Sequence, residues 1–190
     1  LMSRGRFREA RRVAEAALSR SPDPRQGAVL KWIVAESYQL EGDPEEAEAA
    51  FATLARAPGA LGAEASLRLA KCRLQMWDGE SAAEALRGAE PAVLGDRAGE
   101  RDELLAIATF VEGKPKDALA LFEGLARKSD AGWHYLGLIA FNSGDYKTAA
   151  ERFEKAIAAA PDDYYNLLYR ASSLLELNRI DEARTAFVDL

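Results

Sequence analysis

Apolar residues recur along this chain with the period of an α-helix, in a pattern that returns every 31 to 37 residues. Six alanines mark it: Ala10, Ala47, Ala82, Ala118, Ala149 and Ala183. Four residues after them stand Ala14, Phe51, Leu86, Phe122, Phe153 and Phe187, and seven after them stand Ala17, Leu54, Ala89, Leu125, Ala156 and Leu190. Residues at i, i+4 and i+7 share one helix face. The pattern therefore predicts six helices, each with one apolar face.

A second helix is predicted before each of the last five markers. A small residue stands twelve positions earlier, where it lets another helix approach closely: Ala35, Ala70, Ala106, Gly137 and Ala171. Five positions before the markers stand Gly5, Gly42, Gly113, Gly144 and Asn178. Glycine and asparagine tolerate the left-handed conformation that ends a helix, so these residues predict turns. The third segment is irregular, because its Gly79 lies only three residues before Ala82. Pro22, Pro58, Pro91 and Pro161 stand where the second helices should end.

These segments resemble the tetratricopeptide repeat family. The best match runs from Asp130 to Asp163, with signature residues at Trp133, Leu136, Gly137, Gly144, Tyr146, Ala149, Phe153, Ala156 and Pro161. The segment from Ala28 matches at Ala35, Tyr38, Gly42, Ala47, Phe51 and, one residue early, Pro58. The segment near Gly99 matches at Leu105, Ala106, Gly113, Ala118 and Phe122. Two segments depart from the family by having Asp102 and Arg73 where an aromatic residue is usual.

The resemblance implies an all-α fold, a right-handed α-solenoid of stacked helix–turn–helix repeats that is truncated at both ends. We expect a single array: residues 1–24 as the second helix of a partial repeat, repeats at 28–61, 63–94, 99–129 and 130–163, and a partial repeat at 164–190. Neither end shows the polar cap that normally closes a solenoid, so we expect a segment of a longer array. Segment 91–99 either divides the array into halves or, as we favour, is only a longer connection.

In this family the first helix of each repeat lines a concave surface that binds a peptide or a partner helix. Carried onto this chain, the resemblance predicts a groove lined by Trp32, Leu67, Arg68, Lys71, Leu104, Ile107, Phe110, Tyr135, Leu138, Phe141, Tyr165, Leu168 and Tyr169. The C-terminal half of this wall, from Leu104 to Leu175, is apolar, and the N-terminal half is mixed and polar. We therefore expect an apolar or amphipathic partner segment. The alternative is that several of these side chains only pack between repeats.

Charged groups on the predicted wall leave two interpretations open. Arg68 and Lys71 lie one helical turn apart and could meet one carboxylate or phosphate, or could pair with Glu36 or Glu64. Some family members bind an acidic C-terminus through Lys, Asn and Arg, but the matching places hold Trp32 with Glu36, Leu67 with Lys71, and Glu103 with Ile107. An acidic C-terminal tail is therefore not expected as the ligand.

Composition argues against several functional classes. The net charge of −6 and the lack of a long basic block argue against nucleic-acid binding. The arginines at positions 4, 6, 8, 11 and 12 are interpreted as a solvated helix face. No stretch is long and apolar enough for membrane insertion. The compartment, cytoplasmic or periplasmic, is not predicted, because no signal is recognised.

Catalytic and cofactor chemistry is not predicted. His134 is the only histidine, which excludes a multi-histidine metal site, and it is interpreted as a surface residue rather than a pH-sensitive contact. Cys72 is interpreted as a small core residue. Gly113-Lys114-Pro115 lacks the residues of a phosphate-binding loop, so no cofactor, metal or catalytic residue is expected.

The sequence therefore predicts a protein-interaction scaffold, not an enzyme. Two alternatives stay open: a self-association module, or the regulatory arm of a larger enzyme, regulator or envelope or secretion component. High Ala and Arg usage hints at a bacterial source.

Overall fold

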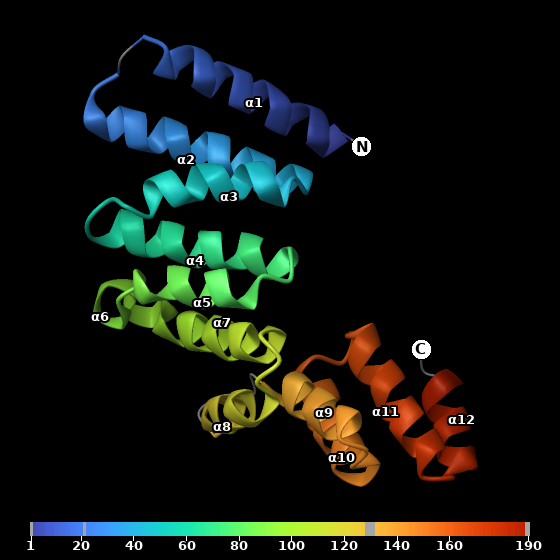
Figure 1. Cartoon of the computed structure of the whole chain (residues 1–190). Coiled ribbons are helices and arrows are strands. Elements are labelled where there is room, and N and C mark those ends of the chain that lie inside the picture. The colour runs from blue at the N-terminus through green and yellow to red at the C-terminus, as the bar shows by residue number, and fades with distance from the viewer. Residues whose placement is uncertain (1, 21, 128–131, 189–190) are drawn as a thin grey trace. The chain divides into compact units, whose positions relative to one another are not determined.

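The computed structural model describes residues 2–20, 22–127 and 132–188, and these residues form helices and short connections without a strand (Figure 1). The chain divides into two compact units, Leu1–Glu112 and Gly113–Leu190. Segment 91–99 lies inside the first unit, where it forms α6 (Pro91–Leu94) and a 3-10 turn (Gly95–Arg97) against α4 and α7. It is therefore a connection rather than a boundary.

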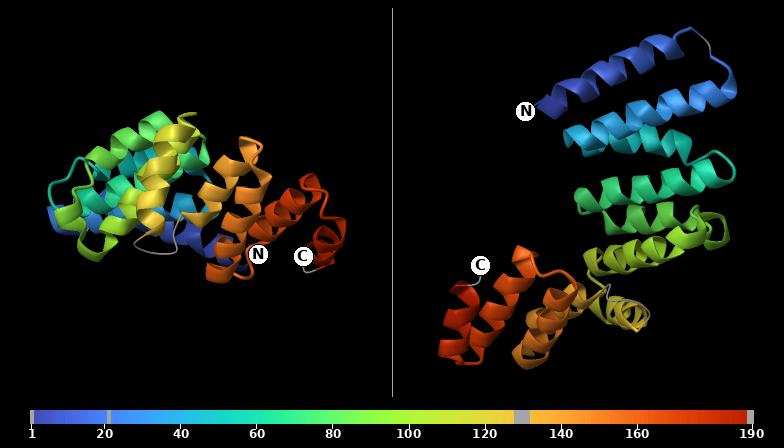
Figure 2. Two further views of the ribbon diagram at one scale, coloured as in Figure 1. Left: turned by 90° about the horizontal axis from the view of Figure 1, so that it is seen from below. Right: turned by 180° about the vertical axis from the view of Figure 1, so that it is seen from behind.

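Unit 1 is a series of antiparallel helices in which each long helix packs against its predecessor in the chain (Figures 1 and 2). The long helices are α1 (Met2–Leu18), α2 (Pro24–Glu41), α3 (Pro44–Leu54), α4 (Ala60–Gln75), α5 (Gly79–Arg87) and α7 (Ala98–Val111). Three of these helices begin with a device typical of helix N-termini. Pro24 and Pro44 occupy the first turns of α2 and α3, and the Asp78 carboxylate accepts the Ser81 N–H at the start of α5.

Unit 2 follows the same plan. It contains α8 (Pro115–Ala126), α9 (Trp133–Asn142), α10 (Tyr146–Ala159), α11 (Tyr164–Glu176) and α12 (Ile180–Val188), each packed against the next. Asp145 and Asp163 cap α10 and α11, because their carboxylates accept backbone N–H groups of the first turn.

The residues predicted to pack are buried in nearly every segment. Ala47, Ala82, Ala118, Ala149 and Ala183 are buried, as are Phe51, Leu86, Phe122 and Phe153. The small residues Ala35, Ala70, Ala106, Gly137 and Ala171 are buried too. Ala10 is the exception. It is exposed because α1 turns Arg11 and Ala14 toward its neighbour instead. Phe187 is 39% exposed, and Leu190 lies outside the described residues.

The predicted turns form at Gly42, Gly113, Gly144 and Asn178, all of which have positive φ. Gly5 does not form one, because α1 runs through it. In the irregular third segment the left-handed residue is Trp77, five positions before Ala82, and not Gly79. Gly79 is needed for another reason. A Cβ there would lie 2.5 Å from the Ala108 carbonyl oxygen, so glycine lets α5 begin directly against α7.

Candidate interaction surfaces

Two residues of the predicted groove belong to the core. Leu67 has no exposed surface and Leu104 is only 7% exposed, and both lie in the hydrophobic cluster of unit 1. The prediction that they line a surface is wrong. Helix α4 contacts α3, α5 and α7, so Leu67 is enclosed from several sides, which the sequence of one helix does not reveal.

The remaining groove residues of α4 take part in a network of ion pairs. Arg68 lies 3.9 Å from Glu36 on α2 and 3.7 Å from Glu64 on its own helix. Glu64 also pairs with Arg97, which lies 2.6 Å from Glu100. Lys71 completes the series at 2.5 Å from Glu100. We call these six residues, Glu36, Glu64, Arg68, Lys71, Arg97 and Glu100, the charged wall of unit 1.

The charged wall answers the question left open for Arg68 and Lys71. Arg68 pairs with both Glu36 and Glu64, as the second interpretation predicted, and it also donates a hydrogen bond to Gln39. Lys71 pairs with Glu100, which was not expected. A ligand carboxylate would therefore have to displace existing partners, and the gain from such an exchange is small at a partly exposed site.

Electrostatics in the charged wall follow from this pairing. Burial works against ionisation of Glu100, but hydrogen bonds and charge from Lys71 and Arg97 outweigh it and lower its pKa. The Glu64 and Glu100 carboxylates raise the pKa of Arg97. Glu103 lies one helical turn from Glu100. Burial, and then the charge of Glu100, raise its pKa.

The other predicted groove residues of unit 1 are half-buried. Trp32 packs its edge against Phe51, with ring centroids 5.3 Å apart. Ile107 and Phe110 on α7 are half-buried as well. Each of these three side chains therefore packs partly against the protein and is partly exposed to solvent.

In unit 2, most of the predicted groove aromatics pack on one another. Tyr135 stacks on Phe122 at 4.8 Å, and Tyr169 stacks on Phe153 at 5.4 Å. Phe141 meets Tyr169 edge to face at 5.4 Å. Leu138, Phe141 and Tyr169 also pack on the buried cluster that contains Phe153. The alternative that these residues pack between repeats is therefore favoured over a free groove surface for Tyr135, Leu138, Phe141 and Tyr169.

His134 belongs to this packed layer and is not an ordinary surface residue. Its ring meets Tyr135 and Phe153 edge to face, at 5.1 and 6.1 Å. Nδ1 of His134 lies 2.7 Å from Oδ1 of the buried Asn166 on α11. The histidine thus joins α9 to α11 through a side-chain hydrogen bond, a partner that lies 32 residues away and that no local pattern indicates.

Among the described residues of unit 2, the most exposed large apolar side chains lie on α11. Tyr165 is 63% exposed and Leu175 is 49% exposed, while Leu168 between them is half-buried. Tyr164 is exposed beside Tyr165. At 100° per residue these four side chains fall on one side of the helix. We call them the α11 stripe. Leu175 was part of the predicted apolar wall, whereas Tyr164 was not singled out.

The interpretation of the N-terminal arginines as a solvated helix face holds for Arg6 and Arg12, is wrong for Arg11 and is incomplete for Arg8. Glu41, whose side chain is 3% exposed, accepts a hydrogen bond from Arg8 at 2.9 Å, and Arg11 lies 2.6 Å from its second oxygen. The Arg11 guanidinium also lies 4.0 Å from the centre of the Tyr38 ring. Arg8 and Arg11 therefore dock α1 onto α2. Arg6 and Arg12 are exposed, and the side chain of Arg4 lies outside the described residues.

Comparison with known families agrees with this architecture. Tetratricopeptide repeat profiles match residues 103–163 and 134–190 in one form and residues 29–53 in another, and together they cover more than half of the chain. The chain belongs to the tetratricopeptide repeat family. Repeats of this family are generally non-catalytic interaction modules, so the chain is a protein-interaction repeat scaffold.

Solved structures show the same fold. A tetratricopeptide repeat protein from Parabacteroides merdae is similar with a TM-score of 0.75 at 14% identity, covering 97% of this chain and 72% of that one. PilF from Pseudomonas aeruginosa is similar at 0.65 and 16% identity, covering 98% and 91%. MamA is similar at 0.62 and 21% identity, covering 82% and 91%. No curated protein sequence matches the chain.

Among the described helices of this tetratricopeptide repeat protein, none has the length and apolar character needed to cross a membrane.

Proposed function

We propose that this tetratricopeptide repeat scaffold binds an apolar or amphipathic segment of a protein partner through the α11 stripe, and that it has no catalytic activity. The observation that carries the proposal is the exposure of Tyr164, Tyr165 and Leu175 on one side of a single helix. Exposed apolar side chains in water are unfavourable, and where several are kept on one side of a helix they commonly mark a binding site. Tyrosine is also enriched among residues that dominate interface energies.

The aromatic packing beneath the stripe supports this assignment. Tyr169, on the same helix, stacks on Phe153 and contacts Phe141, which holds α11 against α9 and α10. Asp163 caps the first turn of α11 next to Tyr164. Because α11 is held in place by these contacts, little conformational entropy is lost when the α11 stripe binds an amphipathic partner segment.

The test uses the double variant Tyr165→Ala/Leu175→Ala. Both side chains are largely exposed, so we expect helicity in circular dichroism to be unchanged. The matched control is Leu121→Ala/Ile180→Ala, which removes two exposed apolar side chains elsewhere in unit 2. Affinity capture with quantitative mass spectrometry should lose specific partners with the first variant and keep them with the second. Equal partner recovery from both variants would refute the proposal.

Self-association through the same stripe is the second candidate, because two copies could cover each other's exposed tyrosines. Light scattering over a range of concentrations separates the two. An average mass that rises with concentration in the wild type, and not in Tyr165→Ala/Leu175→Ala, would identify the partner as a second copy. A constant monomer mass would leave a different protein as the partner.

A further inference from the structure

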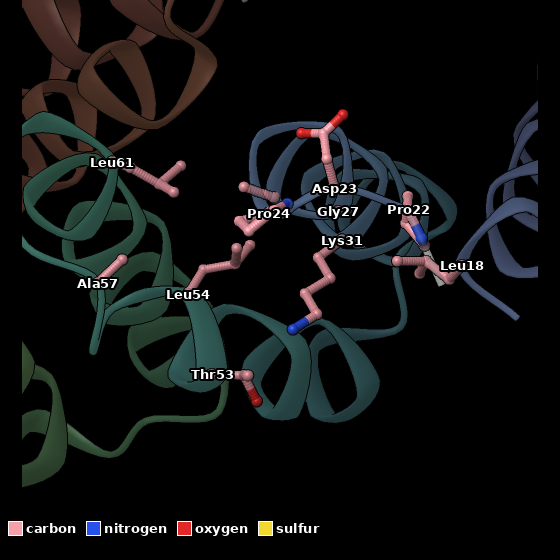
Figure 3. A pocket seen from close by; sticks show the side chains of 11 residues that line it. Leu18, Pro22, Asp23, Pro24, Gly27, Lys31, Thr53, Leu54, Ala57 and Leu61 are labelled. Carbon is pink, nitrogen blue, oxygen red and sulfur yellow. The ribbon is translucent and has the colours of Figure 1, made fainter. Parts of the chain in front are cut away.

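Unit 1 contains an open cavity of about 410 Å³ where the end of α1, the start of α2, the end of α3 and the start of α4 meet (Figure 3). Its walls are mainly apolar. Leu18, Pro24, Leu54 and Leu61 line it, and Lys31 reaches along it from α2. The charged residues of the lining are Lys31 and Asp23, so the cavity combines an apolar floor with one cation and one carboxylate.

A second open cavity, of about 450 Å³, adjoins the first. Leu61 lines both of them. The other apolar walls of the second cavity are Trp32 on α2 and Val93 and Leu94 on the short helix α6. Segment 91–99 thus supplies a wall as well as a connection. Together the cavities form a two-pocket groove, divided by Leu61, at the end of unit 1 where α2 and α4 begin.

The two carboxylates of the two-pocket groove have partners within the protein, whereas its lysine forms no ion pair among the described residues. The Asp23 carboxylate is engaged, because it accepts the N–H groups of Arg25 and Gln26, and it points away from Lys31 (Figure 3). Glu64, which lines the second pocket, pairs with Arg97 and Arg68. Lys31 is exposed and forms no ion pair within the part of the chain that the structure describes. The ammonium of Lys31 extends toward Thr53, at the edge of the first pocket (Figure 3).

We propose that the two-pocket groove binds an internal segment of a partner protein with two apolar side chains and one aspartate or glutamate. Each pocket would take one apolar side chain, on either side of Leu61, and the acidic side chain would pair with Lys31. Two open pockets suit a chain with separate side chains better than a single acyl tail. This site lies in unit 1 and does not depend on the α11 stripe.

The binding experiment uses an array of short synthetic peptides, each with two leucines at variable spacing and one aspartate. Matched peptides carry asparagine or lysine in place of the aspartate. The best binder is then measured by fluorescence anisotropy. We expect the asparagine form to bind about two- to fivefold more weakly, because the ion pair with the exposed Lys31 is lost, and the lysine form to bind more weakly still. No binder on the array, or equal binding of the asparagine form, overturns the proposal.

Variants locate the site. Lys31→Glu should weaken the aspartate peptide about tenfold or more and restore binding of the lysine peptide, while Lys31→Arg should retain the aspartate peptide. Lys116→Glu is the control, since it makes the same charge change at an exposed position on α8. Methyl resonances of Leu54, Leu61 and Leu94 should shift on binding. Peptide binding that survives Lys31→Glu but is lost in Tyr165→Ala/Leu175→Ala would belong to the α11 stripe and overturn this proposal. Displacement of the peptide by laurate would assign the groove to a lipid instead.

Discussion

Trp77 has in the turn between α4 and α5 the left-handed backbone that Gly42 has between α2 and α3, with φ values of +59° and +84°. A residue with a Cβ pays roughly 1–2 kcal/mol for this conformation, whereas glycine does not. The Trp77 side chain is 78% exposed, so packing recovers little of that cost. The α4–α5 turn is therefore less stable than its counterparts at Gly42, Gly113 and Gly144.

We predict that Trp77→Gly stabilises the protein. Relief of the left-handed strain should outweigh the greater freedom of glycine in the unfolded chain, for a net gain of about 0.5–1 kcal/mol. Urea unfolding followed by circular dichroism measures it. Asn178→Gly is the matched control, because asparagine tolerates φ of +58° better than tryptophan, and its gain should be smaller. A lower unfolding midpoint for Trp77→Gly would contradict the strain argument.

Gly137 in unit 2 is a position where the absence of a side chain is needed for packing. A Cβ there would lie 2.6 Å from the ring of Phe153, which is completely buried. We predict that Gly137→Ala destabilises the protein by roughly 1–3 kcal/mol, as overpacking of a core does. Gly124→Ala in α8 is the control. It meets nothing within 4 Å and should stabilise the helix by about 0.5–1 kcal/mol. Two changes of the same sign in thermal unfolding would contradict the prediction.

The repeats could be predicted from sequence because their signals are local. Ala47 and Phe51 lie on one helix face, and Gly42 ends the preceding helix, so periodicity and turn chemistry identify the unit without knowledge of its neighbours. Trp77 was missed for the same reason. Glycine is the residue that usually indicates such a turn, but the glycine of this segment, Gly79, serves close helix packing instead.

The candidate site was predicted less well, because exposure depends on residues far away in sequence. Leu67 occupies a position that faces outward in the family, yet it is buried where α4 meets its neighbours. At the corresponding place on α11, Leu168 is half-buried, and Tyr165 one turn before it is exposed. Arg11 forms an ion pair with Glu41, which lies thirty residues later in the chain. The register of a single helix cannot distinguish these cases.

The docking of α1 should depend on pH through Glu41. Burial raises the pKa of this carboxyl, but hydrogen bonds and charge from Arg11 and Arg8 outweigh burial, and the net pKa lies below its usual value. A lowered pKa in the folded state stabilises the protein above the unfolded-state value of about 4.3, and this contribution is lost as pH falls through the folded value. We predict that Glu41→Gln destabilises the protein at neutral pH and much less near pH 3. Glu45→Gln, an exposed change on α3, should show no such dependence. A Glu41→Gln deficit that stays constant down to about pH 3 would contradict the ion-pair account.

Cys72 offers a measure of how often α4 opens. Burial, reinforced by the charge of Glu48, raises the pKa of this thiol to about 11, and its side chain is inaccessible. Because the thiolate is the reactive form, a thiol reagent near pH 8 should meet roughly one ionised thiol in a thousand, and none in contact with solvent. We predict that the native protein reacts with Ellman's reagent orders of magnitude more slowly than the urea-unfolded protein. The ratio of the two rates then reports the free energy of local opening.

Trp77→Gly, which relieves strain at the end of the same helix, should slow the native reaction further, whereas Asn178→Gly in unit 2 should leave it unchanged. Rapid labelling of the native wild type would show that α4 does not enclose Cys72.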